Sequence, residues 1–395
     1  MKQHVWWVSL AVLSFSVSGC GLGQTASDNM GSSPNFVSEA LAATTTPAAM
    51  PGMEHDMDSM GSDQMASTVT PQAMPGIEHD MDSMTDAATE QQMGHSMEPI
   101  SAAGVPLATE TQGAQLLPFR EEEGGKVFEL TAQAVQWSIL DGVNVVAYTY
   151  NGMVPGPMIR VTEGDQVRVI VKNELPEPTT VHWHGILVPN AMDGVPGMTQ
   201  DPIQPGDSFT YEFIAAPSGT FMYHSHFDSD KQVIVGLYAP FIIDPKTPPA
   251  DPPDVDVMLM FSEWRQVGDQ TFAAMPMTGM DPNYFTINGK AFPNTEPITV
   301  KKGQHVRLRL AAIGQMVHPI HLHGLPFKVV ATDGYPVPAA AQLTKDTLSI
   351  APGERYDIEF IATEPGEWML HCHILHHTTN DGVEPGGLML MINVT

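Results

Sequence analysis

The sequence predicts an all-β protein made of two related Greek-key β-sandwich domains. From about residue 116 onward, short β-branched runs alternate with glycine, proline and aspartate, which is the pattern of a β-sandwich. A proline-rich stretch at 246–254 interrupts this pattern. Motifs that precede the stretch recur after it in the same order. We therefore expect one β domain that is duplicated within the chain.

Residues 1–20 have the features of a lipoprotein-type export signal. One lysine precedes an apolar run that is too short to count as a membrane span, and small residues then lead to Cys20. The tetrapeptide Val-Ser-Gly-Cys at 17–20 resembles a bacterial lipobox, in which cleavage leaves the cysteine as a lipidated first residue. We expect an exported protein that is anchored to a bacterial membrane and faces the periplasm or the cell exterior. A plain secretory signal is the alternative.

Residues 21–115 are predicted to form a disordered, acidic tether rich in methionine and histidine. They contain thirteen Asp or Glu residues, no Lys or Arg and few aromatic residues, so they cannot bury enough apolar surface to become ordered. Within them, TPAAMPGMEHDMDSM at 46–60 recurs as TPQAMPGIEHDMDSM at 70–84. Thioether and imidazole groups suit copper, so one interpretation is a copper-collecting tail. The other is a low-complexity spacer that tolerates methionine.

The rest of the chain is expected to form a first domain at 116–245, a linker at 246–254 and a second domain at 255–395. When residues 162–185 are laid over 301–324 without a gap, a G-x-x-V-R segment and a terminal H-x-H-G fall in register. The formal net charge of −28 argues against nucleic acid as a partner, because a phosphate backbone requires a basic face.

The duplication produces four H-x-H motifs. Side chains alternate along a strand, so the two histidines of a motif point to one face with Cβ atoms roughly 6.5 to 7 Å apart. One such motif would be weak support for a metal site, whereas four at duplicated positions are hard to explain by a structural role. Imidazole favours copper, zinc, iron or nickel over magnesium or calcium. The motifs are His182/His184, His224/His226, His321/His323 and His371/His373.

The same alternation directs the sulfur of Cys372 to the face opposite its neighbours His371 and His373. Cys372 therefore belongs to a different site, for which His318 and His377 are candidate partners. Two histidines and one cysteine with a weak axial group form a blue-copper electron-transfer site. The thiolate would then link an electron acceptor to a multinuclear cluster.

At these motifs the chain resembles the two-domain, laccase-like multicopper oxidases, which are built from cupredoxin domains. The resemblance extends from about residue 116 to 395. It rests on HWHG (182–185), HSH (224–226), HPIHLHG (318–324) and HCHILHH (371–377). The resemblance implies four copper ions per functional unit, namely one type 1, one type 2 and a type 3 pair, held by motifs of this sequence.

The resemblance also implies a role for each motif residue. The type 1 ligands would be His318, Cys372 and His377, and the type 2 ligands would be His182 and His321. The type 3 pair would be held by His184, His224, His226, His323, His371 and His373.

Further roles follow from the same resemblance. Electrons would pass through Cys372 and either His371 or His373 to the trinuclear cluster, where O2 is reduced to water. Asp193 matches an acidic residue that is thought to assist proton delivery in the family.

Only the second domain is expected to carry type 1 copper. In the alignment of the halves, the three type 1 positions are occupied in the first domain by Thr179, Ser225 and Asp230. These three replacements argue against membership of the copper nitrite reductases, whose type 1 cysteine lies in the first of two domains.

The axial position lies in TTNDGVEPGGLM (378–389), which looks like an insertion relative to the family. Placing the family glycine on Gly387 makes Leu388 axial, and a non-coordinating residue there favours a higher reduction potential. Met389 is the alternative.

The resemblance implies an oxidase that takes single electrons from a reducing substrate. Phenols and aromatic amines are the family's usual substrates, whereas the tail together with Met275, Met277 and Met280 favours Cu(I). In two-domain relatives the cluster forms between the first domain of one subunit and the second domain of the next, which implies a homotrimer. A non-catalytic copper carrier or tolerance protein is the alternative function.

Overall fold

The computed structural model describes residues 98–276 and 279–395. The predicted signal at 1–20 lies outside the described residues, as does the greater part of the predicted tether at 21–115. The described end of the tether makes isolated β-bridges, among them Ile100 with Thr271. Within the described ranges, no helix is both long enough and apolar enough to cross a membrane.

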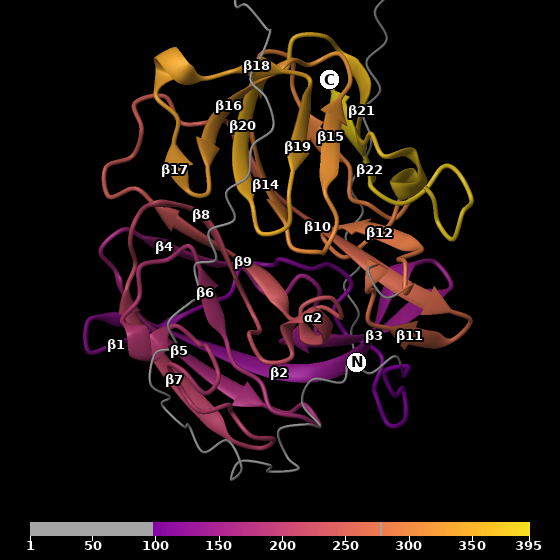
Figure 1. Cartoon of the computed structure of the whole chain (residues 1–395). Helices are drawn as coiled ribbons and strands as arrows, with labels where there is room; N and C mark the ends of the chain where they lie inside the picture. Colours follow the sequence, from indigo (N-terminus) through magenta and orange to yellow (C-terminus); the bar gives the residue numbers. More distant parts are fainter. Residues whose placement is uncertain (1–97, 277–278) are drawn as a thin grey trace, which may run out of the picture. The chain divides into compact units, whose positions relative to one another are not determined.

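The first half of the described chain, indigo to magenta in Figure 1, consists of a five-stranded and a four-stranded sheet. The five-stranded sheet contains β1 (Arg120–Glu122), β2 (Gly125–Leu140), β3 (Val143–Tyr150), β5 (Gln166–Asn173) and β7 (Ser208–Ile214). The four-stranded sheet contains β4 (Ile159–Thr162), β6 (His182–His184), β8 (Gly219–His224) and β9 (Tyr238–Asp244).

The second half, orange to yellow, consists of an eight-stranded and a five-stranded sheet. The larger sheet contains β10 (Val255–Val267), β11 (Gln270–Phe272), β12 (Tyr284–Ile287), β14 (His305–Ala312), β16 (Phe327–Thr332), β17 (Tyr335–Pro336), β18 (Thr344–Lys345) and β20 (Arg355–Ile361). The smaller sheet contains β13 (Ile298–Val300), β15 (His318–Leu322), β19 (Thr347–Ile350), β21 (Gly366–Cys372) and β22 (Met389–Val394).

Helices are short in the described chain. The α-helix α2 spans Ser229–Gln232, and 3-10 helices span Asn190–Met192, Ala339–Ala341 and Leu375–Thr378. The predicted all-β class with two sandwich domains is confirmed.

Strand alternation explains the cores. Along β5, Val167, Val169 and Val171 are buried, while the residues between them are partly or fully exposed. β-branched side chains at every second position fit a pleated sheet with one covered face. Each half builds its core in this way, around Trp183 in the first half and around Phe261 in the second.

Buried polar contacts join the two halves. Arg309 of β14 donates a hydrogen bond to Oγ1 of Thr220 in β8 at 2.6 Å, and Thr220 donates to Asp357 of β20 at 2.7 Å. The indole nitrogen of Trp137 donates to the carbonyl of Gly289 at 2.8 Å. Buried charged and polar groups are stable only when they are paired in this way.

Candidate metal centres

Equivalent strand pairs bring the H-x-H motifs together in each half. In the first half, β6 and β8 pair antiparallel, with His182 opposite His224. In the second half, β15 and β21 pair antiparallel, with His321 opposite His371. Directly opposed residues share a face of the sheet, so the duplicated sequence forms the same histidine cluster twice.

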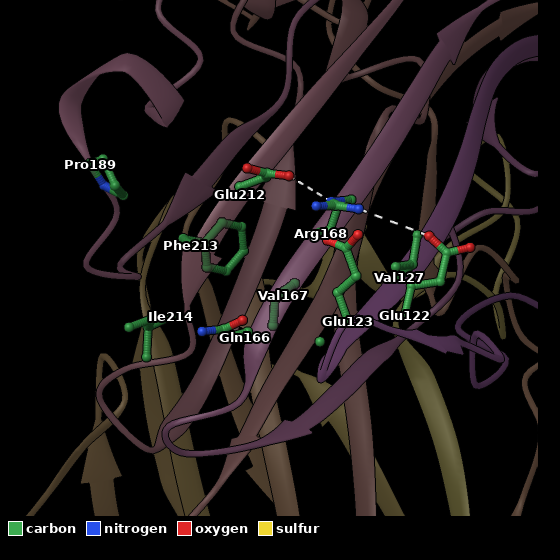
Figure 2. A pocket seen from close by; sticks show the side chains of 11 residues that line it. Glu122, Glu123, Val127, Gln166, Val167, Arg168, Pro189, Glu212, Phe213 and Ile214 are labelled. Atoms are coloured by element: carbon green, nitrogen blue, oxygen red, sulfur yellow. Dashed lines mark hydrogen bonds and ion pairs between the residues drawn. The ribbon is translucent and has the colours of Figure 1, made fainter.

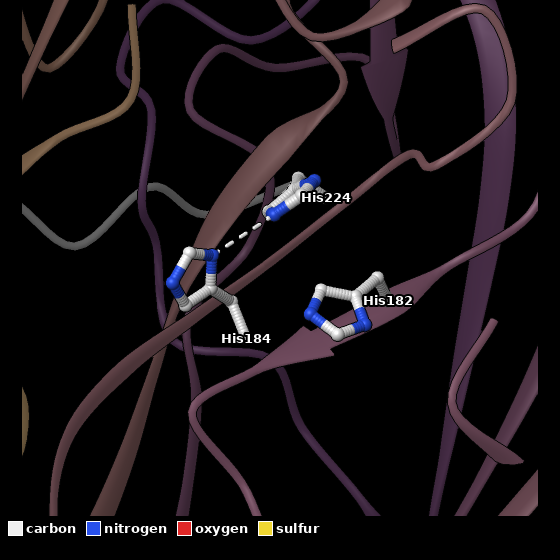
Figure 3. A group of neighbouring side chains, drawn as sticks. All are labelled: His182, His184 and His224. Carbon is white, nitrogen blue, oxygen red and sulfur yellow. Dashed lines mark hydrogen bonds between the residues drawn. The ribbon is translucent and has the colours of Figure 1, made fainter. Parts of the chain in front are cut away.

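The first cluster contains His182, His184 and His224, which face one another in Figure 3. One ring nitrogen of each lies within 4.8 Å of the others. Nδ1 of His184 lies 3.2 Å from Nε2 of His224. His226 joins the cluster through a ring contact with His182, with centroids 5.6 Å apart. The structure thus brings all four predicted histidines of this half together.

The second cluster is centred on His321. Its ring centroid lies 4.9 Å from that of His323, 5.7 Å from His371 and 5.9 Å from His373. Nε2 of His323 lies 3.1 Å from Nε2 of His371. His323 and His373 are exposed. Each half of the described chain therefore presents its own partly open group of four imidazoles.

Backbone carbonyls orient four of these rings through Nδ1. The donor and acceptor pairs are His182 with Asp193 (2.8 Å), His321 with Asp346 (2.9 Å), His224 with Ser225 (2.8 Å) and His371 with Cys372 (2.9 Å). A neutral ring that donates from Nδ1 keeps the lone pair of Nε2 for a metal ion. The same tautomer is selected at equivalent positions of both halves.

Burial keeps several of these rings neutral. Burial, together with the nearby Arg355 guanidinium, lowers the pKa of His184 to about 3. Burial likewise lowers the pKa of His224 to about 4 and also depresses the pKa of His371. Neutral imidazole is the form that binds metal, so these rings are in the binding form at neutral pH.

A separate, buried site lies on the other face of β21. His318, Cys372 and His377 are each 0 % exposed, and their donor atoms lie within 4.8 Å of one another. Sγ of Cys372 lies 3.9 Å from Nδ1 of His318 and 3.5 Å from Nδ1 of His377, and the two Nδ1 atoms are 3.1 Å apart. The structure therefore brings Cys372 together with the two histidines that were its candidate partners. These three residues are called the buried triad below.

Comparison with known proteins gives this arrangement a family. Two family models, both described as Multicopper oxidase, match residues 131–248 and 266–383. The first match contains the first histidine cluster, and the second contains the buried triad and the second cluster. The chain belongs to the multicopper oxidase family.

Several multicopper oxidases and relatives resemble it in detail. The crystal structure of the blue copper oxidase from Nitrosomonas europaea is 38% identical, with a TM-score of 0.62, and the match covers 68% of this chain and 85% of that chain. A copper resistance protein A homolog of Pseudomonas syringae is 32% identical over 64% of this chain and 50% of its own length. The multicopper oxidase MmcO of Mycobacterium tuberculosis is 33% identical over 55% of this chain and 48% of its own. The chain spans about half the length of these curated relatives.

In a multicopper oxidase the metal is copper, and the buried triad fits it. A thiolate and two imidazoles are the donors that copper prefers at electron-transfer sites. Nε2 of His318 donates to Glu263 at 2.7 Å, which leaves the Nδ1 lone pair facing the other two donors. Burial raises the pKa of the Cys372 thiol to about 11 and lowers the pKa of His377 to about 3. A bound cation would reverse the first effect, because metal coordination deprotonates a thiol.

Leu388 lies beside the buried triad, whereas Met389 lies on the other face of the sheet. The Leu388 N–H donates to the carbonyl of His377 at 2.9 Å, and the Leu388 carbonyl accepts from the Cys372 N–H at 3.0 Å. Leu388 and Cys372 pack in the same core. Met389 pairs directly with His371 across the β21–β22 ladder and so shares the face of that histidine. By register, Leu388 rather than Met389 lies on the side of the buried triad.

In the first half of this multicopper oxidase, hydrogen-bonded polar side chains occupy positions that align with the buried triad of the second half. Thr179 and Ser225, at two of the aligned positions, both donate to Oε1 of the buried Gln232, at 2.9 and 2.7 Å. Nε2 of Gln232 donates to Glu177 at 2.8 Å. The alignment places Asp230 at the third position, but Gln232 meets the two hydroxyls because it ends the one-turn helix α2 and points inward.

Asp193, for which the sequence predicted a role in proton delivery, contacts the first cluster. Its Oδ1 lies 3.4 Å from Nδ1 of His182, and its side chain is partly exposed. The next residue, Gly194, has φ +82°, and a Cβ there would lie 2.0 Å from the carbonyl oxygen of Val181. Glycine therefore allows this loop to approach the strand that carries His182.

Two contacts of the triad could not be found from sequence spacing. Glu263 of β10 accepts the hydrogen bond from His318, and the ring of Phe285 stacks on His377 with centroids 4.2 Å apart. Both residues lie outside the histidine motifs and reach the site through strand packing. No periodicity marks them in the sequence.

Two cavities lie apart from the histidines. One, of about 390 Å³, lies on β2, β5 and β7, where Figure 2 shows Arg168 between its partners Glu212 and Glu122. The other, of about 840 Å³, is lined by residues of both halves, including Lys290. The residues that line these two cavities include neither histidine nor cysteine.

Proposed function

We propose that this chain oxidises a reducing substrate in single-electron steps and reduces O2 to water. One observation carries the proposal: Cys372 of the buried triad is flanked by His371 and His373, whose rings belong to the second cluster. A short covalent path therefore links an electron-accepting site to a multinuclear one. Copper bound at these sites supplies the one-electron and O2 chemistry, while the protein supplies donor atoms, orientation and proton access.

In this proposal the buried triad holds type 1 copper, with Leu388 as its non-coordinating axial neighbour. His182 and His321, which both donate from Nδ1 to a backbone carbonyl, hold type 2 copper. The remaining six cluster histidines hold the type 3 pair, so that one functional unit binds four copper ions. The six are His184, His224, His226, His323, His371 and His373.

We assign proton delivery to Asp193. Its carboxylate lies next to His182 and is partly exposed, so it can exchange protons with solvent beside the first cluster. A carboxylate positioned between solvent and a reacting group can transfer protons from one to the other.

We further propose that the clusters are completed between subunits of a homotrimer. In the described part of the chain, the ring contacts of the eight cluster histidines join members of the same half. His323 and His373 are exposed in the single chain. A contact between the first half of one copy and the second half of the next would bring all eight together and close into a ring.

Two substrate classes remain: phenols or aromatic amines, and Cu(I). Curated relatives include a copper resistance protein A of Escherichia coli, and this link to copper makes Cu(I) a candidate substrate here. Of the methionines that favoured Cu(I), Met275 is buried and Met280 packs against the same core, which supports the packing alternative for both. Met277 and the repeats of the tail lie outside the described residues.

We also propose export and lipid anchoring at Cys20, on the strength of the lipobox resemblance alone. Metabolic labelling with a fatty acid tests the anchor. Cys20→Ala should abolish the label and release the protein from the membrane fraction, whereas a label that survives the substitution rules out this site.

Oxygen uptake with a model phenol tests the oxidase itself. The copper-loaded wild type should consume O2 and show a blue absorption band, and Cys372→Ser should lose both. Ser225→Ala, at the equivalent position of the first half, is the control and should keep both. A wild type that binds copper and consumes no O2 with phenols, aromatic amines or Cu(I) would instead be a copper carrier.

A further inference from the structure

We propose that the buried carboxylate of Glu263 positions His318 and lowers the reduction potential of the copper that His318 binds. The inference rests on the proposed function, because it concerns the type 1 site. Glu263 lies on β10, outside every motif from which the copper ligands were predicted. It is a positioning residue, since it acts on the metal through the histidine.

The contact selects the tautomer of His318. Oε1 of Glu263 lies 2.7 Å from Nε2 of His318, and the two residues are 2 % and 0 % exposed. A carboxylate accepts hydrogen bonds, so His318 carries a proton on Nε2 and a lone pair on Nδ1. Nδ1 is the atom that faces Cys372 and His377. The carboxylate therefore aims the donor atom into the triad.

The carboxylate is itself held in place. Its Oε2 accepts a hydrogen bond from the backbone N–H of Gln315 at 3.1 Å. A Cβ on Gly314 would lie 1.6 Å from the same oxygen, so the glycine leaves room for the carboxylate. Glu263 also pairs with Phe285 across the β10–β12 ladder, which fixes its backbone. One side chain thus ties the loop that precedes His318 to the strand behind it.

The other imidazole of the triad has a different environment. Nε2 of His377 is buried and has no hydrogen-bond partner among the described residues, and its ring stacks on Phe285. Glu263 therefore hydrogen-bonds to only one of the two imidazoles. A carboxylate bonded to a ligating imidazole raises the basicity of that ligand, and a buried negative charge stabilises the more positive, oxidised metal. Both effects lower the reduction potential.

Glu263→Gln separates charge from hydrogen bonding. Its amide oxygen still accepts from Nε2 of His318, but the negative charge is gone. In the copper-loaded full chain, we expect the blue band to persist and the reduction potential, measured by redox titration of that band, to rise. Glu263→Leu also removes the acceptor, so we expect copper affinity, measured by competition with a chelator, to fall roughly 10- to 100-fold.

Asp357→Asn is the matched control, because Asp357 is another buried carboxylate of the same half and is bonded to Thr220 outside the copper sites. It should lower the thermal midpoint without moving the potential. If Glu263→Gln does not fold, Gly314→Ala provides a second test: its methyl group displaces the carboxylate from His318, which weakens the hydrogen bond and should also raise the potential.

The outcomes distinguish the two proposals. A blue band with an unchanged potential in Glu263→Gln, or in Gly314→Ala where that variant replaces it, overturns the role of Glu263 and leaves the oxidase intact. A copper-loaded wild type without a blue band overturns the type 1 site on which the oxidase depends.

Discussion

The sulfur of Cys372 lies 3.5 Å from Nδ1 of His377, a residue that follows it by one short turn. β21 ends at Cys372, and the 3-10 helix Leu375–Thr378 turns the chain so that imidazole and sulfur face the same space. His371, one residue earlier, contacts His321 of the second cluster instead. A single segment at 371–377 therefore contributes to both proposed copper centres.

Subunit mixing tests whether the oxygen-reducing cluster forms between chains. His184→Ala damages the first half, and His323→Ala damages the second. If the cluster joins the first half of one subunit to the second half of the next, a mixed ring contains one intact cluster. Each variant alone should be inactive in O2 uptake, and trimers reassembled from equal amounts should recover roughly a quarter of the wild-type activity.

The control for this prediction is a mixture of His184→Ala with His224→Ala, which are both in the first half. No arrangement of these subunits contains an intact cluster, so activity should stay at background. Sedimentation should give the mass of three chains. A wild-type monomer that is fully active and fully copper-loaded would contradict the shared cluster.

Leu388→Met should lower the reduction potential of the type 1 copper, because a thioether next to the buried triad adds a weak axial ligand. The packing of Leu388 in the core that contains Cys372 supports this position. Redox titration of the blue band measures the change. Met389→Leu is the matched control and should leave the potential unchanged. A shift in Met389→Leu without one in Leu388→Met would make Met389 the axial residue.

Gln232→Leu should destabilise the first half without affecting copper. The side chains of Thr179 and Ser225 both donate to Gln232, so its loss leaves two buried hydroxyls without this acceptor. We expect the free energy of unfolding to fall by about 1 to 3 kcal/mol. Denaturant titration measures this loss, and Gln270→Leu at an exposed position of β11 is the control. A changed blue band in Gln232→Leu would contradict the expectation that this residue does not influence the copper site of the second half.

Lys290 should make stability depend on pH in the alkaline range. Burial lowers its pKa from the ordinary 10.5 to about 8, where it donates to the carbonyl of Ser138 and lies over the ring of Trp137. Between these pH values the unfolded chain keeps a proton that the folded chain has released, so the free energy of unfolding rises with pH.

Comparison with Lys290→Met isolates this effect, because other titrating groups cancel in the difference. The unfolding free energy of the wild type minus that of Lys290→Met should increase from pH 8 to about 10.5. The exposed Lys246→Met is the control and should give a constant difference. A difference that stays constant for Lys290→Met as well would refute the shifted pKa.

Much of the candidate site followed from local patterns. The period of two along a strand predicted that Cys372 and its histidine neighbours face opposite ways, and the structure confirms it. The alignment of the halves located Thr179 and Ser225, whereas Gln232, to which both hydroxyls donate, lies two residues beyond the aligned Asp230. Gln232 belongs to the helical turn α2, where the period of a strand does not predict the direction of a side chain.

By itself, the sequence determined the all-β class, the duplication and the ten histidines and one cysteine of the proposed sites, because strand alternation and motif spacing are local properties of the chain. Only the tertiary structure decided that Glu263 bonds to His318 and that Leu388 rather than Met389 lies beside Cys372. It also decided that Gln232 accepts the hydrogen bonds of the two hydroxyls aligned with triad residues in the first half. Those contacts depend on strand register and on packing between distant segments, which residue spacing does not encode.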